Sequence, residues 1–205
     1  CVSDNSTLLL SRGVTGFLPS ISCLPPENME PTLTRLAAET EKAAGARAIG
    51  IHSEGPVFAS PGAHNPRNLQ KPSVELAERM LAASNGRLKA VTLAPELPGA
   101  EAFIKRLKAD GVSIHLGHSQ AVPDDVARYA SWGIDAVTHM YNVMRQPEPG
   151  NMGLHILSLT DALMAEAGLA LGLICDGIHV SPKLMKILAQ LPVERVFLET
   201  DANKY

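Results

Sequence analysis

Four polar side chains stand at the ends of short apolar segments in this chain: Glu54, His118, His139 and Asp201. Two imidazoles and one carboxylate are the ligand types that a catalytic zinc ion or a related divalent metal takes from a protein. A further carboxylate that does not bind the metal can accept a proton from water and later return it to a leaving group. Together these residues predict a metal-dependent hydrolase with Asp201 as its base.

Other polar residues in or after the apolar segments have less certain roles. His64 and His179 lie on loops that follow such segments, so each is either a plain surface residue or a donor that polarises a carbonyl or binds hydroxyls. His52 and His115 lie inside apolar segments, where a hydrogen-bonded core or supporting histidine is the expected role. We expect Glu199, which lies on the same side of its strand as the predicted base, to be structural.

These residues are positioned by apolar segments that alternate with amphipathic stretches along the chain. We expect seven strands, at residues 13–21, 46–54, 88–94, 112–117, 136–139, 170–176 and 196–201. Helices are expected between them, over residues 29–44, 74–81, 100–110, 123–132, 157–167 and 182–190. Strands that are apolar throughout and separated by single helices are typical of a parallel sheet that is buried on both faces.

Such a parallel sheet is either open and doubly wound or closed into a barrel. No Gly-x-Gly-x-x-Gly motif follows the first strand, and polar residues end many strands instead of gathering at one switch point. This favours a (β/α) barrel, whose active site forms at the carboxyl ends of several strands. With seven strands in the sequence, we expect residues 1–205 to be a single catalytic barrel domain without its first strand, as a fragment of a longer protein.

Composition excludes several other classes of protein. A chain of 205 residues with 45% hydrophobic residues, 19% charged residues and a net charge of −3 is typical of a globular enzyme and gives no reason to expect a nucleic-acid partner. Its apolar runs are shorter than the roughly 18 residues of a membrane span, so no membrane partner is expected. The odd, widely spaced cysteines, Cys1, Cys23 and Cys175, predict free thiols in a reducing compartment and hence a cytoplasmic location.

A set of short motifs occurs in order along nearly the whole chain. They are Ile51-His52-Ser53-Glu54-Gly55-Pro56, Gly62-Ala63-His64-Asn65, Val91-Thr92-Leu93-Ala94-Pro95-Glu96, Gly117-His118-Ser119, Thr138-His139-Met140-Tyr141-Asn142-Val143-Met144, Asp176-Gly177-Ile178-His179-Val180 and Thr200-Asp201-Ala202. With these motifs the sequence resembles the N-acetylglucosamine-6-phosphate deacetylases of the amidohydrolase superfamily. The resemblance implies a TIM-type (β/α)8 barrel of the metal-dependent hydrolases, accompanied in the family by a small β-sandwich.

The resemblance also implies a role for individual residues. Glu54, His118 and His139 would hold one divalent metal ion, zinc or iron; Asp201 would be the catalytic acid and base, and His64 would assist the acetamide carbonyl. Contacts to an amino-sugar substrate are expected from Ala63, Asn142, Val143, Arg145, Asp176, Gly177 and His179. The implied reaction hydrolyses N-acetylglucosamine 6-phosphate to glucosamine 6-phosphate and acetate, in amino-sugar catabolism.

Two departures from the family pattern keep alternatives open. Family members carry a phosphate-binding Arg, which acts across a homodimer interface, where this chain has Pro147; Arg145 is the candidate replacement. N-acetylgalactosamine 6-phosphate or an unphosphorylated sugar therefore remains an alternative substrate, and a homodimer is expected. The first strand and the β-sandwich lie outside this sequence, so a catalytically silent subunit is a second alternative. We expect the isolated segment to be less stable than a longer protein.

Overall fold

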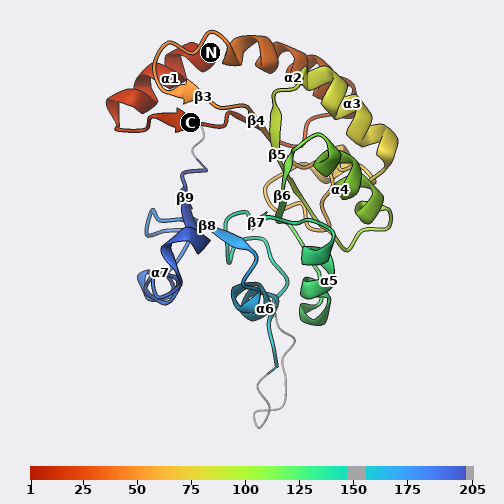
Figure 1. Ribbon diagram of the computed structural model, residues 1–205, viewed down its shortest axis with the longest axis vertical. Helices are drawn as coiled ribbons and strands as arrows, with labels where there is room; N and C mark the ends of the chain where they lie inside the picture. Colours follow the sequence, from red (N-terminus) through yellow and green to blue (C-terminus); the bar gives the residue numbers. More distant parts are fainter. Residues whose placement is uncertain (147–155, 202–205) are drawn as a thin grey trace.

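A computed structural model describes residues 1–146 and 156–201, in which parallel strands form a curled sheet with helices along its outer side (Figure 1). The helices are α1 Val2–Ser11, α2 Pro26–Thr40, α3 Val74–Ser84, α4 Ala100–Ala109, α5 Val126–Ser131, α6 Leu159–Ala165 and α7 Pro182–Leu188, with 3-10 turns at Pro66–Asn68, Pro123–Asp125 and Val193–Arg195. The strands are β1 Gly16–Phe17, β2 Ser20–Ile21, β3 Arg47–Ala48, β4 Ile51–Glu54, β5 Leu88–Leu93, β6 Ser113–Leu116, β7 Ala136–Val137, β8 Ala170–Ile174 and β9 Val196–Glu199.

The main sheet has seven strands in the order β2-β4-β5-β6-β7-β8-β9, and every neighbouring pair is parallel. Strand order follows chain order because each crossover brings the next strand alongside the one before it. The predicted α/β class and parallel sheet are therefore confirmed. Within the described residues the sheet is a half-barrel with β2 and β9 at its edges.

Two of the expected strands, at residues 13–21 and 46–54, are each broken in the structure. Their first halves, β1 and β3, form a separate two-stranded sheet, and their second halves, β2 and β4, join the main sheet. Pro19 lies in the first break and has no backbone N–H to donate to a ladder. Gly50 lies in the second break, where a Cβ would collide with the Lys89 side chain and the Arg87 carbonyl. The missing side chain therefore lets β5 approach closely.

The helices pack against the outward-facing side chains of the strands. In α4, Phe103, Ile104 and Leu107 are fully buried and recur at helical spacing, while Lys105 and Arg106 on the opposite face form ion pairs. The helix expected from residue 74 begins there because the Ser73 hydroxyl accepts a hydrogen bond from the Leu76 N–H at 3.1 Å. The core thus lies between the sheet and its helices, which leaves the inner side of the sheet for polar residues.

Helix α1 has no counterpart among the predicted elements. Its buried residues are only Val2 and Ser6, so it lacks the apolar stripe from which an amphipathic helix could be predicted. Contacts from far along the chain hold it instead: the Ala46 N–H donates to the Ser6 carbonyl at 2.8 Å, and the Gly45 N–H donates to the Ser6 hydroxyl at 3.0 Å. Such tertiary contacts do not appear in a local sequence pattern.

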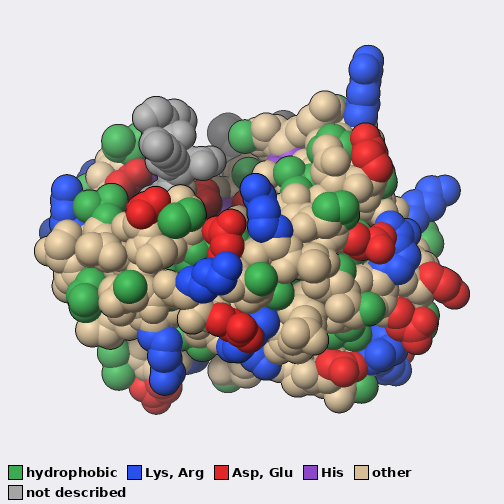
Figure 2. All heavy atoms as spheres, turned by 90° about the horizontal axis from the view of Figure 1, so that it is seen from above, with side chains coloured by type: hydrophobic (Ala, Val, Ile, Leu, Met, Phe, Trp, Pro, Cys, Tyr) green, Lys and Arg blue, Asp and Glu red, His purple; other side chains and the backbone are tan. Residues whose placement is uncertain are grey.

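The surface carries charges of both signs. Figure 2 shows Lys and Arg side chains interspersed with Asp and Glu on the face it presents, in keeping with the net charge of −3. None of the helices in residues 1–146 and 156–201 is long and apolar enough to cross a membrane.

Candidate metal centre

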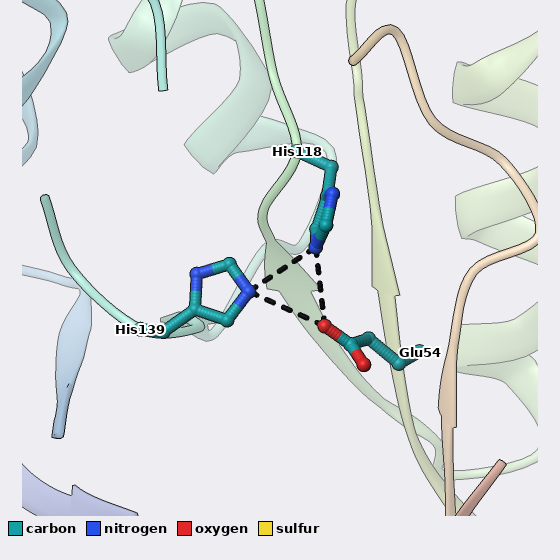
Figure 3. Close-up of side chains that lie close together, drawn as sticks. All are labelled: Glu54, His118 and His139. Carbon is teal, nitrogen blue, oxygen red and sulfur yellow. Dashed lines mark hydrogen bonds and ion pairs between the residues drawn. The ribbon is translucent and has the colours of Figure 1, made fainter. Parts of the chain in front are cut away.

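Three side chains from the ends of β4, β6 and β7 meet at the carboxyl edge of the sheet (Figure 3). Glu54 is the last residue of β4, and His118 and His139 each follow the end of a strand, β6 and β7, by two positions. Parallel strands present all their carboxyl ends at one edge, so residues distant in sequence come together there. His118 and His139 are almost fully buried. The structure thus brings together the three residues expected to bind a metal.

The donor atoms of these residues lie at mutual distances that suit a metal ion. His118 Nε2 is 3.1 Å and His139 Nε2 is 3.3 Å from Glu54 Oε1, and the two Nε2 atoms are 3.2 Å apart. Zinc binds such atoms at about 2.0–2.2 Å in a tetrahedral arrangement, which separates neighbouring donors by roughly 3.3 Å. The donor set and its spacing therefore both fit zinc or a similar divalent cation.

The ring of His118 is oriented by two groups from the loop after β4. Its Nδ1 donates to the Ser60 carbonyl at 3.0 Å, and its ring stacks on Phe58 with centroids 4.0 Å apart and an interplanar angle of 9°. A neutral imidazole that donates from Nδ1 has a free lone pair on Nε2. His118 is thus prepared to bind a cation through Nε2, the atom that faces Glu54.

His139 is oriented mainly through its backbone. The His139 N–H donates to Oε1 of Glu199, a side chain that comes from β9. Within the described residues, His139 Nδ1 is the buried side-chain nitrogen or oxygen that has no hydrogen-bond partner. Glu54 Oε1, 3.3 Å from Nε2, favours the tautomer that carries its proton on Nε2, whereas a metal ion bound at Nε2 would place the proton on Nδ1.

Several functional candidates occupy strained backbone conformations. His118, His139 and Asp201 have φ angles of 52°, 35° and 43°, in the left-handed region that residues with a side chain rarely adopt. Val143, a β-branched residue for which this region is more costly, has a φ of 49°. Such conformations cost about 1–3 kcal/mol each and are concentrated at active sites. Their grouping at one edge of the sheet marks that edge as the functional one.

The Glu54 carboxyl remains ionised despite its burial. Burial alone would raise its pKa, but the close contacts with the imidazoles of His118, His139 and His64 outweigh that effect and hold the pKa far below its usual value. A carboxylate that stays charged among imidazoles provides the negative charge that a divalent cation requires. The site is therefore electrostatically suited to a cation in the position between these groups.

His64 lies beside the cluster with a defined hydrogen-bonding role. Its Nε2 is 3.5 Å from Glu54 Oε2, and its Nδ1 accepts a hydrogen bond from the Cys23 backbone N–H at 3.4 Å. Because Nδ1 acts as the acceptor, a neutral His64 carries its proton on Nε2, the atom that faces the cluster. His64 can thus donate a hydrogen bond to a group bound at this site.

Asp201 lies within electrostatic reach of the cluster. Loss of hydration and the negative charge of Glu54 raise the pKa of the Asp201 carboxyl, while His139, His179 and His118 act in the opposite direction. A carboxylate with a raised pKa is a better proton acceptor than an ordinary Asp. The direction of this pKa shift is the one that a base requires.

The loops after β4 and β7 meet beside the cluster of Glu54, His118 and His139. A Cβ at Gly62 would lie 3.0 Å from His118 Cε1 and 3.1 Å from both methyl carbons of Val143. Asn142 and the exposed Ala63, both predicted to contact a substrate, are the sequence neighbours of Val143 and Gly62.

The loop after β8 is organised by Asp176. Its Oδ1 accepts from the backbone N–H groups of Ile178 and His179 at 2.8 and 2.9 Å, and its Oδ2 lies 2.6 Å from His179 Nδ1. These bonds lower the pKa of Asp176 to about 2. The geometry thus favours Asp176 as the residue that orients His179, with Gly177 at a φ of 77° completing the turn.

Arg145 lies next to the loop that carries His118. Its backbone N–H donates to the Ser119 carbonyl at 3.0 Å, and its Nη1 donates to the Gln120 carbonyl at 3.4 Å. The side chain also lines a small cavity of about 90 Å³ between the starts of α5 and α6. Pro147, where the family pattern has its phosphate-binding Arg, lies outside the described residues.

Sequence reasoning did not single out several residues that support the cluster. Phe58 and Ser60 orient His118, and Cys23 orients His64, as described above. Glu96 fixes the turn after His118: it accepts from the Ser119 hydroxyl at 2.8 Å and from the backbone N–H of Gln120. Glu96 follows the end of β5, so the strand-end rule that located the other polar side chains could have found it, whereas Cys23 acts on His64 through its backbone N–H, which no residue type reveals.

A chain of hydrogen bonds crosses the inner side of the sheet beneath the cluster. His52 Nε2 is 2.7 Å from Thr92 Oγ1, which is 2.7 Å from Thr138 Oγ1, which in turn is 3.4 Å from His115 Nδ1. The chain ends at Ser20 and Ser113, 2.9 and 3.1 Å from the outer ring nitrogens. This matches the supporting role expected of His52 and His115.

Comparisons with known proteins agree with the resemblance. No family model matches the chain. The chain is 32% identical over 201 residues to N-acetylglucosamine-6-phosphate deacetylase of Bos taurus, a match that covers 95% of this chain and 48% of the relative. It is 34% identical over 197 residues to N-acetylgalactosamine-6-phosphate deacetylase of Escherichia coli O157:H7, which covers 93% of this chain and 50% of the relative.

Solved structures give the same result for the fold. The N-acetyl-D-glucosamine-6-phosphate deacetylase of Mycobacterium smegmatis matches with a TM-score of 0.87 and 30% identity over 98% of this chain and 52% of its own. A mutant of the enzyme from the same organism, solved in complex with N-acetyl-D-glucosamine-6-phosphate, matches with a TM-score of 0.80 and 31% identity over 90% of this chain and 47% of its own. The chain thus resembles these deacetylases along nearly its whole length and spans about half of theirs.

Proposed function

We propose that this chain is the metal-binding part of a (β/α)8-barrel amidohydrolase that removes the acetyl group of N-acetylglucosamine 6-phosphate. The products are glucosamine 6-phosphate and acetate. The convergence of His118 Nε2, His139 Nε2 and Glu54 Oε1 within 3.3 Å of one another carries the proposal. Zinc or iron held by these residues would supply Lewis-acid chemistry and lower the pKa of water at the site.

Two residues of the chain perform the proton transfers and polarisation in this proposal. Asp201 accepts a proton from the attacking water and returns it to the nitrogen of the leaving amine as the C–N bond breaks. Its raised pKa supports that role. His64 donates a hydrogen bond from Nε2 to the acetamide oxygen, where negative charge develops in the transition state. The proton on Nε2 follows from the Cys23 N–H bond to Nδ1.

Substrate contacts come from the loops around the cluster. The substrate lies between the loop that contains Ala63 and the loop that contains Asn142 and Val143. These two loops are in contact because Val143 packs closely against Gly62. His179, which Asp176 orients, binds a sugar hydroxyl from the loop after β8. Arg145 binds the phosphate, a role favoured by its position beside Ser119 and by the planar donor fork of guanidinium.

The galacto epimer is the second candidate substrate. The observation that favours it is the 34% identity to an N-acetylgalactosamine-6-phosphate deacetylase, slightly above the 32% identity to the N-acetylglucosamine-6-phosphate deacetylase of Bos taurus. We also propose that the enzyme works as a homodimer in the cytoplasm. Free Cys1, Cys23 and Cys175 support the reducing compartment, and exposed apolar side chains such as Leu198 and Val193 support subunit contact.

Acetate release tests the proposed reaction. The protein is loaded with zinc and offered N-acetylglucosamine 6-phosphate, its galacto epimer and both unphosphorylated sugars. The gluco phosphate should have the highest kcat/KM, and Glu54→Gln should lose both bound zinc and acetate release. Bound zinc without acetate from any of these sugars would instead favour a catalytically silent subunit, and a higher kcat/KM for the galacto phosphate would favour the second candidate.

A further inference from the structure

We infer that Glu199 is a positioning residue, which holds the backbone of His139 in the conformation that points the imidazole at the metal centre. The inference rests on the proposed role of His139 as a ligand. Glu199 lies on β9, at the far side of β8 from His139, and its Oε1 accepts the backbone N–H of His139. The carboxylate therefore crosses β8 to accept a hydrogen bond from the backbone of His139, a proposed metal ligand.

Gly172 makes this reach possible. It lies on β8, where it pairs with Phe197, and a Cβ at this position would collide with Oε1 and Cδ of Glu199 and with the Phe197 ring. The backbone of Gly172 also takes part, because its carbonyl accepts the N–H of Met140 at 2.7 Å. The missing side chain and this carbonyl together leave room for a carboxylate directly beside the end of β7.

The backbone at His139 needs such a partner because regular pairing has ended there. The last matched residues of β7 and β8 are Val137 and Leu171, and His139 then turns to a φ of 35°. A buried N–H beyond the ladder must find another acceptor or remain unsatisfied. Glu199 provides that acceptor from outside the strand pair and so stabilises the left-handed turn that aims the ring at Glu54 and His118.

Two substitutions break the contact, and two others are controls that should leave it intact. Glu199→Leu removes the acceptor, whereas Glu199→Gln keeps an oxygen that can accept the same N–H. Gly172→Ala leaves Glu199 in place but blocks its path. Glu194→Leu serves as the control, because Glu194 is an exposed carboxylate on the neighbouring turn. Circular dichroism and the thermal midpoint check that each variant is folded.

Two measurements separate this positioning role from a general structural one. Hydrogen exchange of the His139 amide, followed by NMR in the metal-free protein, reports the contact itself. In Glu199→Leu and Gly172→Ala we expect exchange at least about 10-fold faster, and a zinc dissociation constant weakened by about 10–100-fold, the usual effect of losing a group that supports a metal ligand. Glu199→Gln and Glu194→Leu should stay within about 3-fold of the parent in both.

The results distinguish failure of this inference from failure of the proposed function. Unchanged amide exchange in a folded Glu199→Leu variant would overturn the inference, and faster exchange with an unaltered zinc dissociation constant would overturn its link to the metal centre. If the parent protein binds no zinc at all, the proposed function fails, while the exchange rates still decide whether Glu199 holds the His139 backbone.

Discussion

Single residues at the ends of strands carry both the chemistry and the strain of this molecule. Glu54, His118 and His139 could be predicted together because each interrupts an apolar segment at its carboxyl end. Their supporting groups, such as Ser60 and Phe58, come from an irregular loop, where no periodic pattern shows which atom will face a ring. Residue types thus predicted the donor set, whereas the orientation of each donor depends on tertiary contacts.

Replacement of the proposed base should separate catalysis from metal binding. Asp201→Asn keeps the size of the side chain but loses the ability to accept a proton, and Asp201 is not one of the three clustered donors. We expect zinc affinity within about 2-fold of the parent and kcat lower by about 10²–10⁴-fold. Zinc titration and acetate release measure the two effects. Activity near the parental level would remove Asp201 as the base.

Removal of the Arg145 side chain should affect only phosphorylated sugars. Arg145→Ala should raise KM for N-acetylglucosamine 6-phosphate by about 10-fold or more, since a charge-assisted bond contributes about 1.5–3 kcal/mol. KM for the unphosphorylated sugar should be unchanged. Arg128→Ala is the control, because Arg128 lies on α5 and pairs with Asp125. Equal KM changes for both sugars would exclude Arg145 as the phosphate ligand.

The elements could largely be predicted from the sequence, because a parallel sheet has a strong periodic signal. The expected strands at 88–94, 112–117 and 170–176 correspond to β5, β6 and β8. The breaks within residues 13–21 and 46–54 could not be predicted, since they depend on how closely β5 approaches Gly50. The hydrogen bond from the His139 backbone to Glu199, which passes Gly172, could not be predicted from the sequence either. The sequence predicts only that Glu199 lies on the same side of its strand as Asp201.

The polar chain on the inner side of the sheet should make stability depend on pH. Burial lowers the pKa of His115 from 6.5 to about 4, against a smaller opposing effect of Asp135. As pH falls below 6.5 the unfolded chain takes up a proton that the folded protein accepts only near pH 4, so stability decreases across that interval. The loss from this residue is on the order of 3 kcal/mol.

His115→Gln tests this dependence, because Gln can keep a hydrogen bond to Thr138 but does not titrate. Urea unfolding of the metal-free proteins at pH 7 and pH 4.5 should show a smaller loss of stability in the variant by about 2–3 kcal/mol. Identical losses in the two proteins would show that His115 is not buried in its neutral form.

At the scale of the whole molecule, the metal centre links parts of the chain that are far apart in sequence. Its donors lie at the ends of β4, β6 and β7, and the Glu199 contact extends the connection to β9. The sheet that they connect is open at β2 and β9 within the described residues. An ion bound by all three donors would therefore act as a crosslink across the middle of a half-barrel.

Zinc should accordingly raise the thermal midpoint. Free zinc at 100 times its dissociation constant stabilises the folded state by about 2.7 kcal/mol, which in a domain of this size corresponds to roughly 5–11 °C. Differential scanning calorimetry with zinc and with a chelator measures the shift. Glu54→Gln should show little or none of it, and an equal shift in that variant would place the stabilising ion elsewhere.

The left-handed backbone at Asp201 has a consequence for directed evolution. A residue with a side chain is destabilised by about 1–2 kcal/mol at a φ of 43°, whereas glycine adopts it freely. Asp201→Gly should therefore unfold in urea with a free energy equal to that of the parent or up to about 1 kcal/mol higher, and yet release no acetate. A library screened for heat resistance alone would accumulate inactive clones at this position, so selection for a robust catalyst has to include turnover from its first round.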